Sequence, residues 1–189
     1  MGVLPDAELE LLDVVNGEDA IIGQASREKI HRNGLRHRAV HILVFNDEDD
    51  ILVQRRALTK RCAPGLWDSS AAGHVDAGEA YRAAAQREVE EELGISTLDG
   101  LTYLFKLPAS EATGSEFVEV FQTLASQVVQ PDPTEIMDYR WCTWAALDIW
   151  LDAEPHDFTE VFRTIWARWR LTARDESVDR AGTQELDLR

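Results

Sequence analysis

Cysteine is scarce in this chain, which has only Cys62 and Cys142 among 189 residues. The two lie far apart and match no spacing of zinc ligands, which argues against the usual zinc-binding motifs. Two cysteines also do not make the disulfide framework of a small secreted domain. We therefore expect a protein of the reducing cytoplasm.

Long hydrophobic runs and an excess of basic residues are missing as well. No apolar run approaches the roughly 20 residues that a membrane-spanning helix needs, and the N-terminus lacks a charged-then-apolar signal pattern. Asp and Glu number 35 against 19 Lys and Arg, so the formal net charge is -16. Such a charge repels polyanions, which argues against nucleic acid and membranes as partners.

The few basic residues are concentrated in one part of the chain. Nine of the 19 are Arg27, Lys29, Arg32, Arg36, Arg38, Arg55, Arg56, Lys60 and Arg61. They fit either a solvated face or a patch that binds a small phosphorylated molecule, and both readings stay open. In the second case the substrate-binding set is Arg55, Arg56 and Lys60. Because side chains alternate along a strand, only one of Arg55 and Arg56 would reach the site.

Hydrophobic patterning predicts a single domain that is long enough to bury a core. Its strands are expected at about 9–25 (a hairpin with an Asn16–Gly17 turn), 37–45 and 51–56 (a second hairpin), 67–72, 98–107, 117–125 and 135–142. Its helices are expected after Gly78, after Thr143 as N-cap, and after Asp157 as the cap of an amphipathic terminal helix. The domain would span residues 1–172, and the polar segment 173–189 would be a disordered tail.

The segment from Gly73 to Ile95 reads as a loop that continues into a helix with clustered carboxylates. Tyr81, Ala85, Val89 and Leu93 form the stripe of this helix that would face the core. Glu88, Glu91 and Glu92 share another face, where like charges repel unless a cation offsets them. Oxygen ligands of this kind suit Mg²⁺ or Mn²⁺, although a Glu-rich helix can also be a solvated face.

The residues around the carboxylates suggest a reaction at phosphorus. Arg87 is next to Glu88 and four residues before Glu91, so it can hold a carboxylate through paired hydrogen bonds. Glu79 lies at the helix entry, where negative charge is favoured. A partial protein cage leaves room for substrate phosphates around Mg²⁺, which would polarise the phosphoryl oxygens and lower the pKa of an attacking water.

The pattern Gly73-x5-Glu79-x7-Arg87-Glu88-Val89-x-Glu91-Glu92-x-Gly94-Ile95 resembles the complete signature box of the Nudix superfamily. The resemblance implies an α/β (α+β) fold, an α/β/α sandwich with a central mixed β-sheet and a loop–helix–loop metal site. It also implies a metal-dependent hydrolase of a nucleoside or other organic diphosphate. By matching position, Glu88, Glu91 and Glu92 would bind the metal and Gly73 would contribute its carbonyl. The catalytic set would be Glu91, Glu88 and Arg87.

Segments outside the box, together with Gly73–His74 at its start, look like the Nudix branch that contains isopentenyl-diphosphate isomerase. They are Leu35 to Ala39, Leu52 to Arg56, Lys60, Pro64 to Asp68, Gly73–His74 and Met137 to Cys142. The isomerase has a cysteine immediately before the Gly–His pair, where this chain has Ala72, and its signature box is degraded. Without that acid or base isomerisation is disfavoured, and Cys62 is no obvious substitute. The isomerase and a non-catalytic ligand-binding module remain the alternatives to a hydrolase.

His74 in the box and three residues outside it raise the question of a second metal. Taken alone, His31, His37 and His74 are typical of hydrogen-bonded structural histidines, whereas the resemblance implies that they bind a metal together with Glu116.

The general base and the oligomeric state are also open. Glu91, Glu111, Glu116 and Glu135 are the candidates for the base, and we favour a glutamate of the box. The N-terminal hairpin would offer a strand edge for self-association, so a homodimer is compatible with the sequence.

Overall fold

The computed structural model describes residues 10–96, 100–125 and 127–184, with side chains as far as residue 173. A two-stranded sheet, β1 and β2, precedes a seven-stranded sheet with the order β5-β4-β3-β8-β7, in which β6 pairs with β3 and β9 pairs with β4. The strands are β1 (Leu11–Val15), β2 (Ile21–Ser26), β3 (His37–Phe45), β4 (Ile51–Arg56), β5 (Trp67–Asp68), β6 (Ala71–His74), β7 (Thr102–Leu107), β8 (Glu116–Leu124) and β9 (Ile136–Cys142). The helices are α1 (Arg27–Asn33), α2 (Tyr81–Leu93), α3 (Trp144–Ala153), the 3₁₀ helix η2 (Pro155–Asp157) and α4 (Glu160–Gln184).

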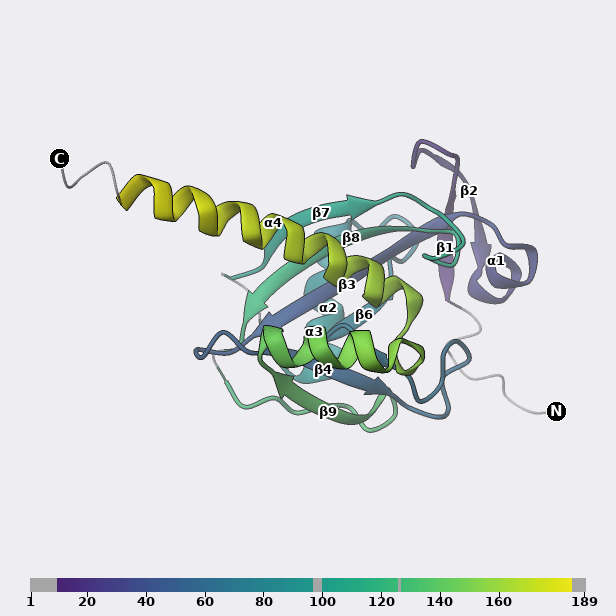
Figure 1. Cartoon of the computed structure of the whole chain (residues 1–189). Helices are drawn as coiled ribbons and strands as arrows, with labels where there is room; N and C mark the ends of the chain where they lie inside the picture. The colour runs from purple at the N-terminus through teal and green to yellow at the C-terminus, as the bar shows by residue number, and fades with distance from the viewer. Residues whose placement is uncertain (1–9, 97–99, 126, 185–189) are drawn as a thin grey trace.

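Strand β3 is the centre of the large sheet and is buried on both faces. Leu43 and Phe45 contribute to a core that α3 and α4 cover, whereas Val40 and Ile42 contribute to a second core beneath α2. Figure 1 shows α2 behind the sheet and α3 and α4 in front of it. Strand β3 pairs in parallel with β8 and antiparallel with β6, so the sheet is mixed. The predicted α/β/α sandwich with a mixed sheet is confirmed.

The N-terminal hairpin forms as predicted, and a helix that the patterning missed follows it. In the hairpin turn the Asn16 side chain accepts hydrogen bonds from the backbone N–H groups of Glu18 and Ala20. Helix α1 then begins after Ser26, whose hydroxyl accepts from the N–H of Lys29, and ends at Gly34 with a left-handed φ of 59°. A capping serine and a terminal glycine were the signals for this short helix. Self-association through the hairpin stays a prediction.

One predicted strand and two predicted helix caps agree with the structure to different degrees. The predicted strand 67–72 is two short strands, β5 and β6. Thr143 caps α3 as predicted, because its hydroxyl accepts from the N–H of Ala146. The cap of α4 is Thr159, which accepts from the N–H of Phe162, and the prediction of Asp157 was wrong because that residue lies inside η2.

The C-terminal helix is longer than the patterning predicts. Helix α4 extends to Gln184 and therefore includes most of the segment expected to be a disordered tail; residues 185–189 lie outside the described residues. Each added helical residue gains a hydrogen bond once the helix is nucleated, and Ala, Arg and Glu in this segment favour helix. The boundary of the domain at residue 172 stays a prediction.

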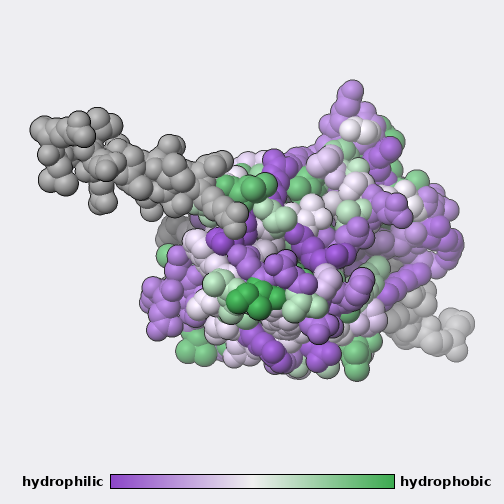
Figure 2. All heavy atoms as spheres, viewed as in Figure 1, coloured by the Kyte–Doolittle hydropathy of each residue, from purple (hydrophilic) through white to green (hydrophobic). Residues whose placement is uncertain are grey.

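The surface formed by α3 and α4 is largely hydrophilic, with separate hydrophobic spots over each helix (Figure 2). Ile149 on α3 and Leu171 on α4 are among the exposed hydrophobic residues of the chain. None of the helices in the described ranges has the length and apolarity that crossing a membrane requires.

Candidate active site

A pocket of about 760 Å³ brings together segments from most of the chain. Its walls come from α1, from the central strands β3, β4 and β6, and from one face of α2. Connecting loops, the end of β5, the start of β8 and the first residues of α4 complete the walls. The lining includes Glu10, Arg27, His31, His41, Arg56, Lys60, Cys62, Asp68, Ala72, Gly73, His74, Arg87, Glu88, Glu91, Glu92, Glu111, Glu116, Glu135 and Thr159.

Helix α2 directs its three predicted metal-binding carboxylates into this pocket. Ala85, Val89 and Leu93 are fully buried under the sheet, as their spacing predicts. The carboxylates differ in burial: the side chains of Glu88 and Glu91 are 12% and 61% exposed, and Glu92 is buried. One helical stripe therefore anchors α2 while the adjacent face supplies oxygen ligands to the pocket.

Glu92 is the most constrained of the three carboxylates. Its Oε2 accepts hydrogen bonds from the backbone N–H of Ala72 at 3.2 Å and from Gln54 Nε2 at 3.0 Å. Burial, and then the negative charge of Glu88, raise the pKa of Glu92 to about 7. Burial also raises the pKa of Glu88, although Arg87 opposes this effect. Two buried carboxyl groups with raised pKa values are the electrostatic situation that a divalent cation would relieve.

Arg87 organises the carboxylates, as its sequence position predicts. Its guanidinium donates to Glu79 through Nε at 3.1 Å and Nη2 at 2.9 Å, to Glu88 Oε1 at 2.6 Å and to Glu91 Oε2 at 3.2 Å. Glu79 also accepts from the N–H of Asp76, which ties the start of the box to the helix. The network fixes the directions of Glu88 and Glu91 without any further ligand.

Gly73 makes this arrangement possible on β6. A Cβ built at this position would overlap the carboxylate of Glu88. The side chain of Glu88 therefore lies directly against the backbone that carries the predicted carbonyl ligand. Only glycine leaves the space for that close approach.

The three predicted histidines form a second cluster in the same region. His31 on α1, His37 on β3 and His74 on β6 have ring centroids 5.0 to 5.2 Å apart, and one possible ligand atom of each lies within 4.8 Å of the others. Glu116 Oε1 lies 3.3 Å from Nε2 of His37 and 3.4 Å from Nε2 of His74. The four residues that the resemblance implied as metal ligands therefore lie in one cluster.

The hydrogen bonding of these histidines leaves a nitrogen of His31 available to a ligand. His31 Nε2 is buried and has no hydrogen-bond partner within the described part of the chain, whereas the buried His37 Nε2 lies 3.3 Å from Glu116 Oε1. His37 Nδ1 lies 3.0 Å from the carbonyl of Leu35, so both ring nitrogens of His37 have an oxygen acceptor nearby. Burial and the two neighbouring histidines lower the pKa of His31 to about 4, so its ring is neutral at pH 7.

Glu10 belongs to this cluster and was missed by the sequence reasoning. Its Oε1 lies 3.2 Å from His74 Nδ1, and its Oε2 accepts from Arg27 Nη1 at 3.0 Å. Burial would lower the pKa of His74, but hydrogen bonds with Glu10 and Glu116 raise it to about 9. Glu10 stands alone before β1 and belongs to no spacing pattern, so only the fold reveals its role.

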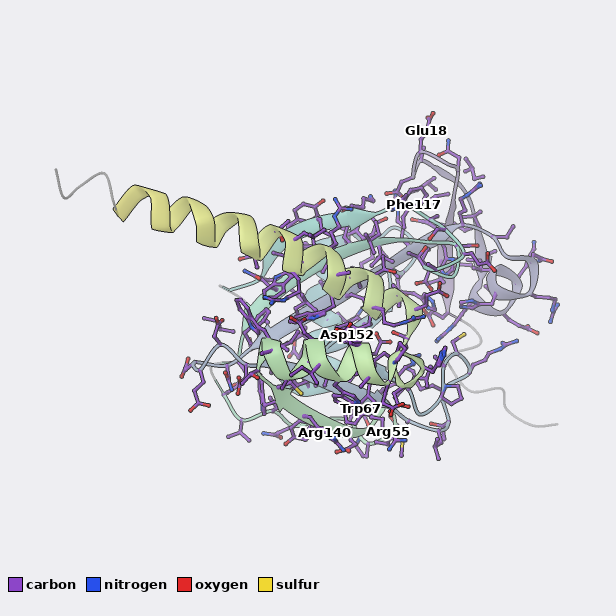
Figure 3. All side chains as sticks on the ribbon, viewed as in Figure 1. Glu18, Arg55, Trp67, Phe117, Arg140 and Asp152 are labelled. Atoms are coloured by element: carbon purple, nitrogen blue, oxygen red, sulfur yellow. The ribbon has the colours of Figure 1, made fainter. Side chains whose placement is uncertain are left out.

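The basic residues divide between the pocket and the outside of the sheet. Arg56 and Lys60 line the pocket, and Lys60 forms an ion pair with Glu135. Arg55 does not line it: its Nε donates to the carbonyl of Gly65, and its guanidinium lies 5.9 Å from the ring centroid of Trp67 (Figure 3). The inclusion of Arg55 among the substrate-binding residues therefore needs correction, because alternation along β4 turns it away from Arg56.

The four candidates for the general base all line the pocket, but their surroundings differ. Glu116 lies beside two histidines and Glu135 is paired with Lys60. Glu91 is the more exposed carboxylate and contacts Arg87. The structure also brings Cys62 to the pocket that Ala72 lines, which their separation in sequence does not suggest.

Comparison with known proteins gives consistent matches. The family model described as the NUDIX domain matches residues 35–162. An isopentenyl-diphosphate Delta-isomerase from Serratia proteamaculans is 34% identical over 160 residues, covering 82% of this chain and 89% of that protein. An uncharacterised Nudix hydrolase from Streptomyces coelicolor is 37% identical over 148 residues, covering 78% and 81%. The crystal structure of DR0079 from Deinococcus radiodurans matches with a TM-score of 0.68 and 28% identity, covering 76% of this chain and 90% of that one.

Proposed function

Because the chain belongs to the Nudix family, we propose that it is a divalent-metal-dependent hydrolase that cleaves the pyrophosphate bond of a nucleoside diphosphate-type or other organic diphosphate. The observation that carries the proposal is the network in which Arg87 holds Glu79, Glu88 and Glu91 beside the buried carboxylate of Glu92. A site that only bound a ligand would not need this arrangement of charges.

Glu88, Glu91, Glu92 and the carbonyl of Gly73 are the residues that would hold Mg²⁺ or Mn²⁺. They fit the ion chemically, because all are oxygen donors and the repulsion between the buried Glu88 and Glu92 is relieved by a cation. When bound, the ion would stabilise the negative charge of the phosphoryl oxygens and make a water molecule more acidic.

The protein's own side chains would then perform three tasks. Arg56 and Lys60 would bind the diphosphate and offset its charge, since both line the pocket in which the carboxylates lie. Arg87 would keep Glu88 and Glu91 in position. Glu91 would accept a proton from the attacking water as the water oxygen bonds to phosphorus and the bridging P–O bond breaks, releasing two phosphorylated products.

We also propose a second metal site at His31, His37, His74 and Glu116. The buried Nε2 of His31, which has no hydrogen-bond partner in the described part of the chain, supports it, because such an atom is costly unless something binds it. Imidazole ligands suit a transition metal better than Mg²⁺. Glu10 would orient His74 from the other side of its ring.

An isopentenyl-diphosphate isomerase is the alternative that a specific observation favours. The 34% identity to the Serratia isomerase and the histidine cluster both support it. Ala72 opposes it, because the residue before Gly73–His74 cannot transfer a proton. Cys62 lines the pocket and is the residue to test if isomerisation is observed.

The test is a panel of diphosphates that includes isopentenyl diphosphate, assayed with Mg²⁺ and Mn²⁺ and followed by mass spectrometry. We expect two phosphorylated products from at least one member and no change in the double bond of isopentenyl diphosphate. Formation of an isomerised product would mean that the protein is an isomerase and not the proposed hydrolase. Binding without turnover of any member would favour a ligand-binding module.

A further inference from the structure

Asp68 is a buried aspartate in the pocket that none of the tasks above uses. It ends β5, and its side chain is only 3% exposed. Oδ1 accepts from the backbone N–H of Ser69 at 2.8 Å and from Thr159 Oγ1 at 2.9 Å. Oδ2 accepts from Arg56 Nη1 at 3.3 Å. A buried carboxylate is costly unless it is paired and hydrogen-bonded, and these three donors meet that requirement.

Thr159 connects Asp68 to the long C-terminal helix. The same hydroxyl that donates to Asp68 accepts from the N–H of Phe162 and so caps α4. The backbone N–H of Thr159 donates to the carbonyl of Trp67, next to Asp68. The start of α4 and the end of β5 are therefore joined by two hydrogen bonds, although Asp68 and Thr159 are 91 positions apart in the sequence.

Arg56 depends on these contacts for its direction. Besides Asp68, its guanidinium contacts the carbonyl of Cys62 through Nε at 3.2 Å. Arginine has several rotatable bonds, so a guanidinium held at one point would lose affinity to disorder, whereas a fixed one is preorganised. The second contact, to Asp68, also supplies the opposite charge that stabilises the partly buried guanidinium before substrate arrives.

His41 does not take over the role of pairing with Asp68. Its Nδ1 lies 2.7 Å from Ser69 Oγ but 3.8 Å from Asp68 Oδ1, beyond hydrogen-bond distance. Burial lowers the pKa of His41, so this ring is neutral near pH 7. The charge that matches Asp68 is therefore that of Arg56.

We propose that Asp68 is a positioning residue, which aims the guanidinium of Arg56 at the diphosphate of the substrate and is itself held by Thr159 at the start of α4. The proposal rests on the proposed function only in requiring that the pocket binds a diphosphate. It assigns to the junction of β5 and α4 a role in substrate affinity in addition to its role in folding.

The experiment measures binding of methylenediphosphonate, a diphosphate that cannot be hydrolysed, by calorimetry in the presence of Mg²⁺. We expect Asp68→Asn to weaken binding about tenfold, the effect of losing one charge-assisted contact. In protein that already carries Arg56→Ala, we expect Asp68→Asn to change affinity less than about twofold, because the positioned group is gone. Lys60 and the carboxylates remain in that background, so binding stays measurable at higher ligand concentration.

Asp148→Asn is the matched control. Asp148 accepts from Arg170 at 2.9 Å and from Trp166 outside the pocket, so this variant breaks a comparable aspartate–arginine pair. It should lower thermal stability but leave the affinity unchanged. Should Asp68→Asn fail to fold, Thr159→Val removes the hydroxyl that holds Asp68 and should weaken binding by a smaller factor that again depends on Arg56.

Three results would overturn the proposal. Unchanged affinity in Asp68→Asn, or an equal loss with and without Arg56, would mean that Asp68 serves folding alone. Unchanged affinity in Thr159→Val where Asp68→Asn cannot be purified would do the same. If the unaltered protein does not bind methylenediphosphonate at all, the proposed function fails together with the positioning role, which distinguishes that outcome from the others.

Discussion

Gln54 on β4 donates a hydrogen bond of 3.0 Å to Glu92 on α2, although the two residues are 38 positions apart. Both side chains are buried. The central sheet thus holds the most buried carboxylate of the box, because Gln54 on β4 and the N–H of Ala72 on β6 both donate to the same oxygen of Glu92. The metal-binding face of α2 is therefore shaped partly by β4 and β6.

Replacing Gln54 with leucine should weaken the Mg²⁺ dependence of turnover more than it lowers the stability of the fold. The variant leaves one oxygen of Glu92 with a single donor, which costs on the order of 1–3 kcal/mol in a buried site and favours the protonated carboxyl. We expect the Mg²⁺ concentration for half-maximal turnover to rise, with a lower midpoint in denaturant titrations. Gln122→Leu, on β8 and outside the pocket, is the control and should leave the Mg²⁺ dependence unchanged.

Glu91→Gln and Glu92→Gln should each abolish most Mg²⁺-dependent turnover while the fold is kept. Each variant removes a negative oxygen ligand, and a loss of about 100-fold in kcat corresponds to roughly 3 kcal/mol. Removing one of the mutually repelling charges should not lower the melting temperature. Glu90→Gln, on the exposed face of the same helix, should keep full activity. Near wild-type rates in both active-site variants would contradict the assignment of the metal site.

Manganese should stabilise the protein through the histidine cluster. A ligand that binds only the folded state at 100 times its Kd adds about 2.7 kcal/mol of stability, which a thermal melt detects without any turnover. With saturating Mg²⁺ present to fill the carboxylate site, we expect His31→Asn to remove most of the remaining Mn²⁺-dependent increase in melting temperature, since it removes a buried nitrogen without a partner. His156→Asn, at an exposed position, should leave the increase intact. Equal increases in both variants would locate Mn²⁺ elsewhere.

The contacts of Asp19 in the N-terminal hairpin predict how the free energy of unfolding depends on pH. Asp19 at its tip accepts from Arg38 Nε at 2.7 Å and from the hydroxyl of Tyr81 at 3.0 Å, and it pairs with Lys106. Burial would raise the pKa of Asp19, but these donors lower it below its usual value of 3.8. Its ionised form thus stabilises the fold above pH 3.8, and the contribution is lost as the pH falls through the lower pKa of the folded state.

Asp19→Asn should therefore reduce stability by about 2 kcal/mol at pH 7 and by less in acid below pH 3. Asparagine tolerates the left-handed backbone at this position, where φ is 61°. Asp49→Asn is a close control, because Asp49 has φ 66° in an equivalent turn but is exposed. The measurement is urea denaturation at several pH values. A difference between the two variants that does not shrink in acid would contradict the role of the Asp19 charge.

Local spacing determined the part of the site that lies on one helix. Residues three and four apart share a helical face whatever the rest of the chain does, so Glu88, Glu91 and Glu92 could be grouped from the sequence. The adjacent Arg87 and the stripe that buries α2 follow from the same periodicity. Alternation along β4 likewise predicted that only one of Arg55 and Arg56 would enter the pocket.

Tertiary structure decided everything that joins distant segments. The sheet register chose Arg56 over Arg55, and folding brought His31, His37 and His74 together from three different elements. The contacts of Glu10 with His74 and of Asp68 with Thr159 span 64 and 91 positions. Such contacts leave no periodic trace in a sequence, because they depend on how strands and helices pack rather than on the geometry of any single element.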